Sequence, residues 1–456
     1  MTSHETEQAT IPPEREFEDV RDTVPVNMEP AAAPDSAAFQ AKYMGRDLAA
    51  GLITGAMAIP LSVGISMMSE YPIKVGLATV AFACLIGWIN AWFRPGNYIG
   101  CPGIAAGLAP VLAVGVATFG LENMPFAIFL TAIIQAVIWK FNWQRYLLLA
   151  VPVYLVEGLL AGVGLKIALK FLTFTYELPA GMESTDAFWN GARMQMVLIS
   201  MIGYVVFVYL FLKFKNTQPA VPYFVIIVAG VVLAQFVSVP MLSMEDLELT
   251  LALPIPHVAS PLTLVYMVGF SVMLAVIDVI EQVMSNAAIE KIDPLKRKCN
   301  SNNSLFAIWI ANMGSSFFGG MTNLDGLAKS TTNRLAGAYT KFSVLVIGCV
   351  VTFFTFNTQS LAYLPKFALA VIMIFSGWKM IEGLVHVTYH GPYALILAIL
   401  CGLLVFQVGI FEGLLAAMAV HGIVHYMVYA NLEKMPGREI VRRYIDDLKK
   451  HGADIS

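Results

Sequence analysis

Long apolar runs separated by short polar connections dominate the chain. Four of the clearest runs carry almost no charge: residues 196–212, 221–237, 342–356 and 393–408. Each approaches the length of roughly 17–25 residues that crosses the hydrocarbon layer of a membrane as a helix. Dividing the chain into such helices and short loops predicts about 12–14 membrane spans, some of them only half-length. The pattern therefore predicts an all-α integral membrane protein.

The two ends of the chain lack such runs. Residues 1–45 are rich in Glu, Pro, Thr and Ala, which predicts a disordered cytoplasmic segment and not a cleavable signal peptide. Residues 46–430 hold all the apolar runs and form the predicted transmembrane domain. Residues 431–456 are polar again, and their basic residues suit one short amphipathic helix in a cytoplasmic tail.

Composition excludes a water-soluble protein of this size. Hydrophobic residues make up 58% of the 456 residues and charged residues only 13%, whereas soluble domains carry roughly 25% charged residues. The five cysteines lack the spacing of a metal site or a disulfide framework, so we expect reduced thiols and no bound metal. The formal net charge of -3 gives no indication of a nucleic-acid partner.

The distribution of Lys and Arg predicts how the chain crosses the membrane. Basic residues fall in alternate connections: Arg94, Lys140 and Arg145, Lys213 and Lys215, Lys296, Arg297 and Lys298, Lys341, Lys379 and the C-terminal tail. The other connections are acidic or neutral, with Lys74, Arg193 and Lys366 as exceptions. Because positive residues are retained on the cytoplasmic side, we expect a multi-pass protein of the cell membrane with both termini in the cytoplasm. An even number of spans follows, and fourteen fits best.

Two polar segments interrupt the apolar pattern. Residues 97–107 and 319–333 contain Gly, Pro, Asn or Asp at places where spans are expected. Irregular backbone is tolerated inside a membrane only where it is buried in protein or lines a cavity, and a pair of such breaks is typical of inverted-repeat transporters. The N-termini of the two half-helices would meet and offer N–H groups to an anion. The alternative is that the glycines only permit close helix packing.

One predicted span carries acidic residues. Residues 270–289 are apolar except for Asp278, Glu281, Gln282 and Ser285, and Asp278, Glu281 and Ser285 share one helical face. A carboxylate at the centre of a bilayer costs about 2.5–3.5 kcal/mol on insertion scales, so it should face a cavity, a partner or an ion. Glu281 and Ser285 could bind Na⁺ through oxygen, or Glu281 could take up a proton. The alternative is an ion pair of Asp278 or Glu281 with Lys329.

Enzyme chemistry has no support in the sequence. There is no Ser-His-Asp order, phosphate-binding loop or metal-ligand cluster. We therefore expect a transporter, with a channel of the same fold as its main rival. Saturable uptake with counterflow would indicate the carrier, and unitary currents would indicate the channel.

Several segments together resemble the sulfate permease (SulP) family of anion transporters, over roughly residues 45–430. They are 47–60, 156–158 with 161–164, 300–302, 333–340 and 364–370. The resemblance implies a seven-plus-seven inverted repeat with a core domain of spans 1–4 and 8–11 and a gate domain of spans 5–7 and 12–14. It further implies alternating access by an elevator-like motion and, commonly, a homodimer.

The resemblance also implies the site residues. The substrate site is bordered by the starts of spans 3 and 10 and by the first span, at the positions of Leu61, Gly103, Ile104, Gly326, Ala328 and Lys329. Glu281 and Ser285 match the acidic residue and the hydroxyl that family members use for cation coupling, and Asp278 lies on the same face.

The chain departs from the family pattern at three places. Ala328-Lys329 replaces a usual Ser-Arg, which keeps the positive charge but loses a hydroxyl and the fork that binds planar oxyanions. Leu61 replaces a common Gln, and Asp325 adds a negative charge near the site. Most members also carry a STAS domain after the last span, and we expect none here because only about 25 residues follow.

The sequence thus predicts a secondary active transporter for a small solute, preferably an anion such as bicarbonate, sulfate or a carboxylate. Na⁺ or H⁺ would be the coupling ion, with no other cofactor, and the partners would be the substrate and membrane lipid. The alternatives are an anion channel or exchanger of the same fold, or a symporter for a zwitterionic or cationic organic solute.

Overall fold

The computed structural model describes residues 35–144, 146, 152–178, 191–244, 248–257, 260–432, 434, 436, 438–439 and 442. Within these residues six helices are long and apolar enough to cross a membrane: Ala41–Met68, Ile73–Phe93, Leu121–Phe141, Gly191–Phe214, Pro261–Ile292 and Lys366–Val387. Further apolar helices are shorter. The mostly helical, apolar architecture predicted above is confirmed, and the number of spans stays a prediction.

Helices and two short strands follow one another along the chain. They are α2 (Asp35–Ala38), α3 (Met44–Met68), α4 (Ile73–Phe93), β1 (Pro102–Ile104), α5 (Ala109–Phe119), α6 (Met124–Phe141), α8 (Val153–Leu172), α9 (Gly191–Phe214), α10 (Val221–Leu233), α11 (Pro261–Ile292), α12 (Ser301–Ser316), β2 (Asn323–Asp325), α13 (Leu327–Leu335), α14 (Phe342–Phe356), α15 (Lys366–Val387), α16 (Pro392–Gln407) and α17 (Ile410–Leu432). Short 3-10 turns are η1 (Ala41–Tyr43), η2 (Leu121–Asn123), η3 (Thr173–Thr175), η4 (Thr358–Tyr363) and η5 (Thr388–His390).

Local sequence explains several helix starts. Proline occupies the first turn of α5, α6, α10, α11 and α16, where its missing N–H has no intrahelical partner to lose. Asn300 caps α12, since its side-chain oxygen accepts a 2.9 Å hydrogen bond from the backbone N–H of Asn303. The family-like segment 300–302 is thus a helix start.

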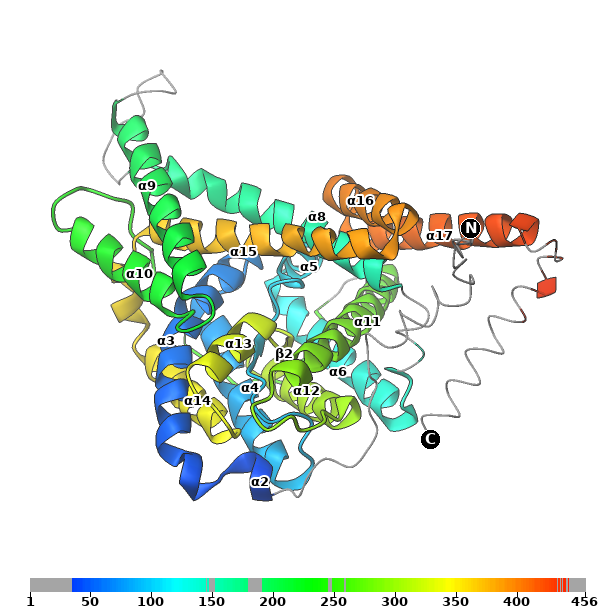
Figure 1. The fold of residues 1–456 in the computed structure, drawn as a ribbon, viewed down its shortest axis with the longest axis horizontal. Helices are drawn as coiled ribbons and strands as arrows, with labels where there is room; N and C mark the ends of the chain where they lie inside the picture. The colour runs from blue at the N-terminus through cyan, green and yellow to red at the C-terminus, as the bar shows by residue number, and fades with distance from the viewer. Residues whose placement is uncertain are drawn as a thin grey trace, which may run out of the picture.

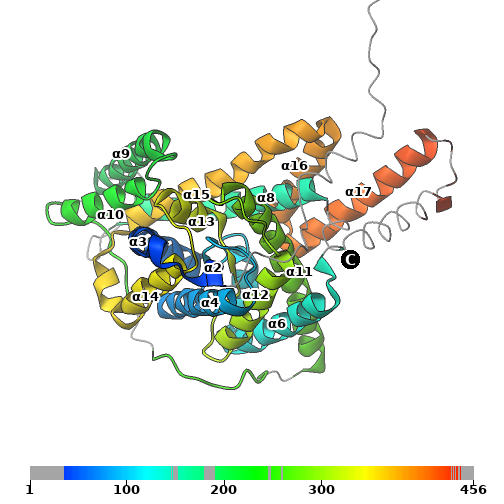
Figure 2. The same cartoon turned by 60° about the horizontal axis from the view of Figure 1, so that its bottom comes forward.

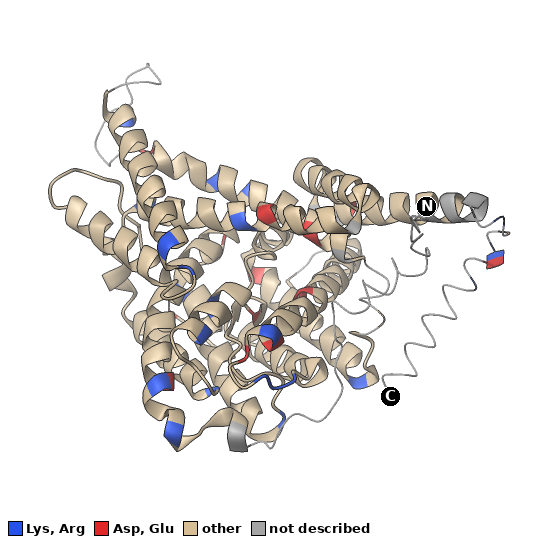
Figure 3. Cartoon of the chain, in the orientation of Figure 1, with Lys and Arg blue, Asp and Glu red and all other residues tan. Residues whose placement is uncertain are grey.

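The helices form two groups (Figure 1). A compact body contains α3, α4, α6 and α11 to α14, and a second group of α8, α9, α10 and α15 to α17 lies along one side of it in both views (Figures 1 and 2). Charged residues are sparse along the helices (Figure 3). Apolar side chains such as Ile202 and Val205 of α9 are 64% and 66% exposed, which suits a surface that faces lipid.

Close backbone approach fixes the packing of α8. A Cβ atom at Gly158 would overlap the carbonyl oxygen of Ala398 in α16, and one at Gly164 would overlap the carbonyl oxygen of Gly377 in α15. Small residues let membrane helices approach this closely. The glycines of the family-like segment 156–164 therefore hold α8 against α15 and α16.

The two polar breaks meet at the centre of the molecule. β1 pairs with β2 in antiparallel register, with Pro102 opposite Asp325, Gly103 opposite Leu324 and Ile104 opposite Asn323. α5 has 11 residues and α13 has nine, so each is shorter than a membrane span. The strand pair thereby places the starts of two short helices near each other.

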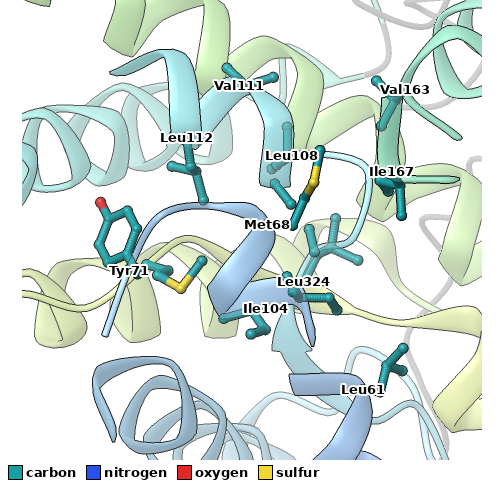
Figure 4. Close-up of a cluster of buried hydrophobic side chains, with 14 of the residues drawn as sticks. Leu61, Met68, Tyr71, Ile104, Leu108, Val111, Leu112, Val163, Ile167 and Leu324 are labelled. Carbon is teal, nitrogen blue, oxygen red and sulfur yellow. The ribbon is translucent and has the colours of Figure 1, made fainter. Parts of the chain in front are cut away.

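An apolar cluster joins this centre to the second group of helices (Figure 4). It contains Ile104 and Leu324 from the strands and Leu108 at the start of α5. Val163 and Ile167 of α8 belong to the same cluster. The strand pair, the start of α5 and α8 therefore contribute to one apolar cluster.

The described part of the N-terminal segment is helical. Residues 35–45, which composition alone placed in the disordered segment, contain α2, η1 and the start of α3. Ala37 is buried, and its carbonyl oxygen accepts a 2.9 Å hydrogen bond from the backbone N–H of Lys341. Small apolar residues thus pack against the start of α14. Residues 1–34 and most of 431–456 lie outside the described residues.

Replacement of Gly158 tests the close packing of α8. Gly158→Ala is expected to lower the melting temperature of the detergent-purified protein, because overpacking a tight contact costs about 1–3 kcal/mol. Gly422→Ala in α17 is the control, since a Cβ there meets nothing within 4 Å. The account of α8 packing fails if both variants melt like the wild type.

Candidate functional site

A lysine lies beneath the strand pair. Lys329, in the first turn of α13, is 3% exposed, and its Nζ donates to the carbonyl oxygen of Pro102 at 3.4 Å. A Cβ atom at Gly103 would overlap this Nζ, and one at Gly326 would lie 3.0 Å from the Cε of Lys329. The structure thus brings the predicted residues Gly103, Gly326 and Lys329 together, and the two glycines leave the space that the lysine fills.

The surroundings of Lys329 are electropositive. Gly326 caps α13 without a side-chain hydrogen bond, and the first turn of a helix leaves N–H groups without intrahelical partners. Among the described residues no carboxylate forms an ion pair with Lys329, so the pairing with Asp278 or Glu281 considered above is not found there. The neighbouring Ala328, in the same first turn, is exposed.

Glu281 lies on the opposite side of residues 103–107 from Lys329. This α11 residue is 9% exposed, and a Cβ atom at Gly107 would overlap its carboxylate. Its Oε1 has no hydrogen-bond partner among the described residues. Ser285 follows one helical turn later and is partly buried. Residues 103–107 therefore pass between a buried ammonium and a buried carboxylate.

Asp278 has a different environment. It is fully buried, and its Oδ2 accepts hydrogen bonds from Gln135 Nε2 at 2.6 Å and Asn312 Nδ2 at 3.2 Å. The side-chain oxygen of Asn312 in turn accepts from the backbone N–H of Asn323 at 2.8 Å. The Oδ1 of Asp278 has no hydrogen-bond partner among the described residues. Through Oδ2, Asp278 contacts residues of α6 and α12. It ties α11 to β2.

Asp325 is held by a saturated network. Its Oδ2 accepts hydrogen bonds from Asn97 Nδ2 at 2.7 Å and Gln282 Nε2 at 3.0 Å, and its backbone N–H donates to Gln282 Oε1 at 2.8 Å. The Nζ of Lys341 lies 3.8 Å from Asp325 Oδ1 and donates to the carbonyl oxygen of Gly100 at 2.6 Å. The negative charge that Asp325 adds is thus compensated inside the protein.

Leu61 and Ile104 belong to the apolar wall of the site. They are 8% and 2% exposed and lie in one cluster with Leu324 and Met68 (Figure 4). Leu61, where a polar residue is common in the family, therefore contributes packing and no hydrogen bond.

Sequence reasoning missed several residues that shape this region. Gln135 and Asn312 are polar residues inside apolar helices, a signal that was present but not used. Lys341 was read only as a basic loop residue. Its partnership with Asp325 depends on the pairing of β1 with β2, which no short-range pattern reveals.

Comparison with known proteins identifies the family. The model of the sulfate permease family matches residues 44–392, and the chain belongs to that family. It is 25% identical over 358 residues to YvdB of Bacillus subtilis (strain 168), named as a candidate sulfate transporter, and the match covers 74% of this chain and 64% of YvdB. YbaR of the same organism, named likewise, is 25% identical over 352 residues, with 74% and 68% covered. The chain thus spans under two thirds of the length of YvdB.

Solved structures show the same fold. The transmembrane domain of the cyanobacterial bicarbonate transporter BicA matches with a TM-score of 0.69 at 18% identity, covering 82% of this chain and 98% of that chain. The inward-facing murine anion transporter Slc26a9 matches with a TM-score of 0.67 at 15% identity, covering 93% and 74%. This protein is therefore a multi-pass integral membrane protein of a transporter family, not an enzyme.

The Asp325–Lys341 pair offers a test of the network. Lys341→Met is expected to destabilise the protein by about 3 kcal/mol, because it leaves a buried carboxylate without its cation. The double variant Asp325→Asn with Lys341→Met should recover part of this loss. Thermal melting in detergent measures both.

The exposed pair of Lys379 and Glu382 supplies the control. Lys379→Met should cost no more than about 1 kcal/mol. Equal melting temperatures for the single and double variants at positions 325 and 341 would contradict the proposed coupling.

Proposed function

We propose that the protein is a secondary active transporter of small anions and that the anion binds beside Lys329, between the starts of α5 and α13. The observation that carries this proposal is a buried ammonium at the positive end of a short helix without an ion-pair partner among the described residues. Burying a charge inside a membrane protein is costly unless a counter-charge is present. A bound anion supplies that counter-charge.

Charge compensation favours an anion over a zwitterionic or cationic solute. Zwitterionic or cationic solutes were considered because Asp325 adds a negative charge near the site. The Oδ2 of Asp325 accepts hydrogen bonds from Asn97 and Gln282, and the Lys341 ammonium lies near its Oδ1. The substrate class includes bicarbonate, sulfate and small carboxylates. The names of the relatives, which refer to sulfate and bicarbonate, are consistent with this class.

Cation coupling is assigned to Glu281 and Ser285. Glu281 is buried and has an oxygen without a hydrogen-bond partner in the described chain, so a proton or Na⁺ would relieve its charge. For Na⁺, the hydroxyl of Ser285 one turn away offers a further oxygen ligand. Binding of the cation and the anion on either side of residues 103–107 would favour each other electrostatically.

The two helix groups correspond to a core and a gate in this proposal. The first repeat is α3 to α6 with α8 to α10, and the second is α11 to α17, so that α5 and α13 are the half-helices of spans 3 and 10. The hydrogen-bond networks of Asp278 and Asp325 stay within the core, while the strand pair and α8 contribute residues to one apolar cluster. An elevator-like movement would slide along this apolar surface and break the hydrogen bonds that Lys170 of α8 donates to Met67 and Met68 of α3. A homodimer with cytoplasmic termini completes the arrangement.

Neutralising Lys329 tests the anion site. Lys329→Met keeps the side-chain length but removes the charge, and it should raise the KM for anion uptake by about 10-fold or more, as expected for losing a charged hydrogen bond. Initial uptake of labelled sulfate, bicarbonate and succinate into proteoliposomes measures this. Lys213→Met, at an exposed position of α9, is the control. An unchanged KM for every transported anion removes Lys329 from the site.

Neutralising Glu281 tests coupling. Wild-type uptake should rise under an inward Na⁺ or H⁺ gradient, and Glu281→Gln should make uptake insensitive to either gradient. Asp278→Asn is the comparison, since Asp278 lies in a structural network and its loss should lower stability while leaving gradient dependence in place. Gradient stimulation that survives in Glu281→Gln would refute the assignment.

A further inference from the structure

A second cavity lies away from Lys329, at the turn between α3 and α4. Its volume is about 280 Å³, and it is lined by Met67 and residues 70–74 together with Leu121, Ser243 and Met244. The loop distribution of Lys and Arg puts this turn on the face opposite the cytoplasm. The ring of Tyr71 belongs to the apolar cluster that also contains Ile104 and Leu108. Tyr71 therefore both lines the cavity and belongs to this apolar cluster.

The hydroxyl of Tyr71 lacks a partner. The side chain is 4% exposed, and no described residue forms a hydrogen bond with its hydroxyl. Figure 4 shows this hydroxyl pointing away from the apolar cluster. Burial raises the pKa of Tyr71, so the phenol keeps its proton and remains a hydrogen-bond donor. A buried donor without an acceptor is unfavourable, which points to a ligand that accepts.

The charges around the cavity favour an anion as that ligand. Glu70 is neutralised by Lys170, whose Nζ lies 3.4 Å from the carboxylate and donates to the carbonyl oxygens of Met67 and Met68 at 3.2 Å each. The remaining polar groups of the lining residues are the ammonium of Lys74, the hydroxyl of Ser243 and the hydroxyl of Tyr71, which is itself buried. All three groups can donate hydrogen bonds.

We propose that this cavity is a second anion site, in which a small oxyanion accepts a hydrogen bond from Tyr71 near the ammonium of Lys74 before it moves on to Lys329. The proposal rests on the proposed transport of anions. It adds a binding step at the turn between α3 and α4, on the face that the loop charges predict to lie opposite the cytoplasm.

Protection of a cysteine against labelling tests the site directly. Ser243 is exposed, so Ser243→Cys places a thiol on the rim, and Cys349→Ser removes the one cysteine that is exposed. The protein is reconstituted in neutral phosphatidylcholine and treated with a membrane-impermeant thiol reagent. Sodium sulfate or sodium bicarbonate should slow labelling about threefold at twice the Kd, relative to sodium gluconate of equal ionic strength.

Variants separate this site from the site at Lys329. Tyr71→Phe should raise the anion concentration needed for protection about tenfold, as expected for losing one hydrogen bond to a charged group. Tyr223→Phe, at another buried tyrosine, is the control and should leave that concentration unchanged. Lys329→Met should also leave this anion concentration unchanged. A failure of the proposed transport site at Lys329 can therefore be distinguished from a failure of the site in this cavity.

Three results would overturn the proposal. They are no slowing by either anion, equal protection in Tyr71→Phe and the parent, or loss of protection in Lys329→Met. A further experiment measures labelling of the same cysteine in phosphatidylglycerol vesicles with sodium gluconate as the only added salt. Protection in that experiment would assign the cavity to a lipid headgroup and reject the soluble anion.

Discussion

The pairing of β1 with β2 is the constraint on which the rest of the structure depends. Backbone N–H and C=O groups inside a membrane protein need partners, and two chain segments that leave the helical path lose their own. β1 and β2 satisfy each other through a short antiparallel ladder, extended by the hydrogen bond from Gly326 N–H to the carbonyl of Cys101 at 3.0 Å. This ladder holds the starts of α5 and α13 at the centre of the compact body.

Buried charges around the ladder divide into two kinds. Asp278 accepts hydrogen bonds from two amides at Oδ2, and Asp325 accepts from two amides and also has Lys341 nearby, so both serve to hold β2 against the neighbouring helices. Lys329 has no ion-pair partner among the described residues, and Glu281 Oε1, like Asp278 Oδ1, has no hydrogen-bond partner there. Lys329 and Glu281 lie on either side of residues 103–107. Unsatisfied charge is unfavourable for the protein alone, and it is what a carrier needs if substrate and coupling ion are to stabilise each other's binding.

Much of this arrangement could be predicted from the sequence, because some signals are local. The apolar runs, the breaks at 97–107 and 319–333, and the isolated acidic residues of α11 are visible without any tertiary information. The partners of these residues were not predictable, since Asn97 and Asp325 are 228 positions apart and Gln135 and Asp278 are 143 apart. That Asp278 contacts amides of α6 and α12 could be decided only once those helices were placed.

The most direct test of the central claim is an experimental structure with selenate, an oxyanion that the anomalous signal of selenium locates. The account predicts selenate within hydrogen-bond distance of the Lys329 ammonium, in front of the first turn of α13. An empty site at saturating selenate, with a carboxylate of the protein paired to Lys329 instead, would contradict it.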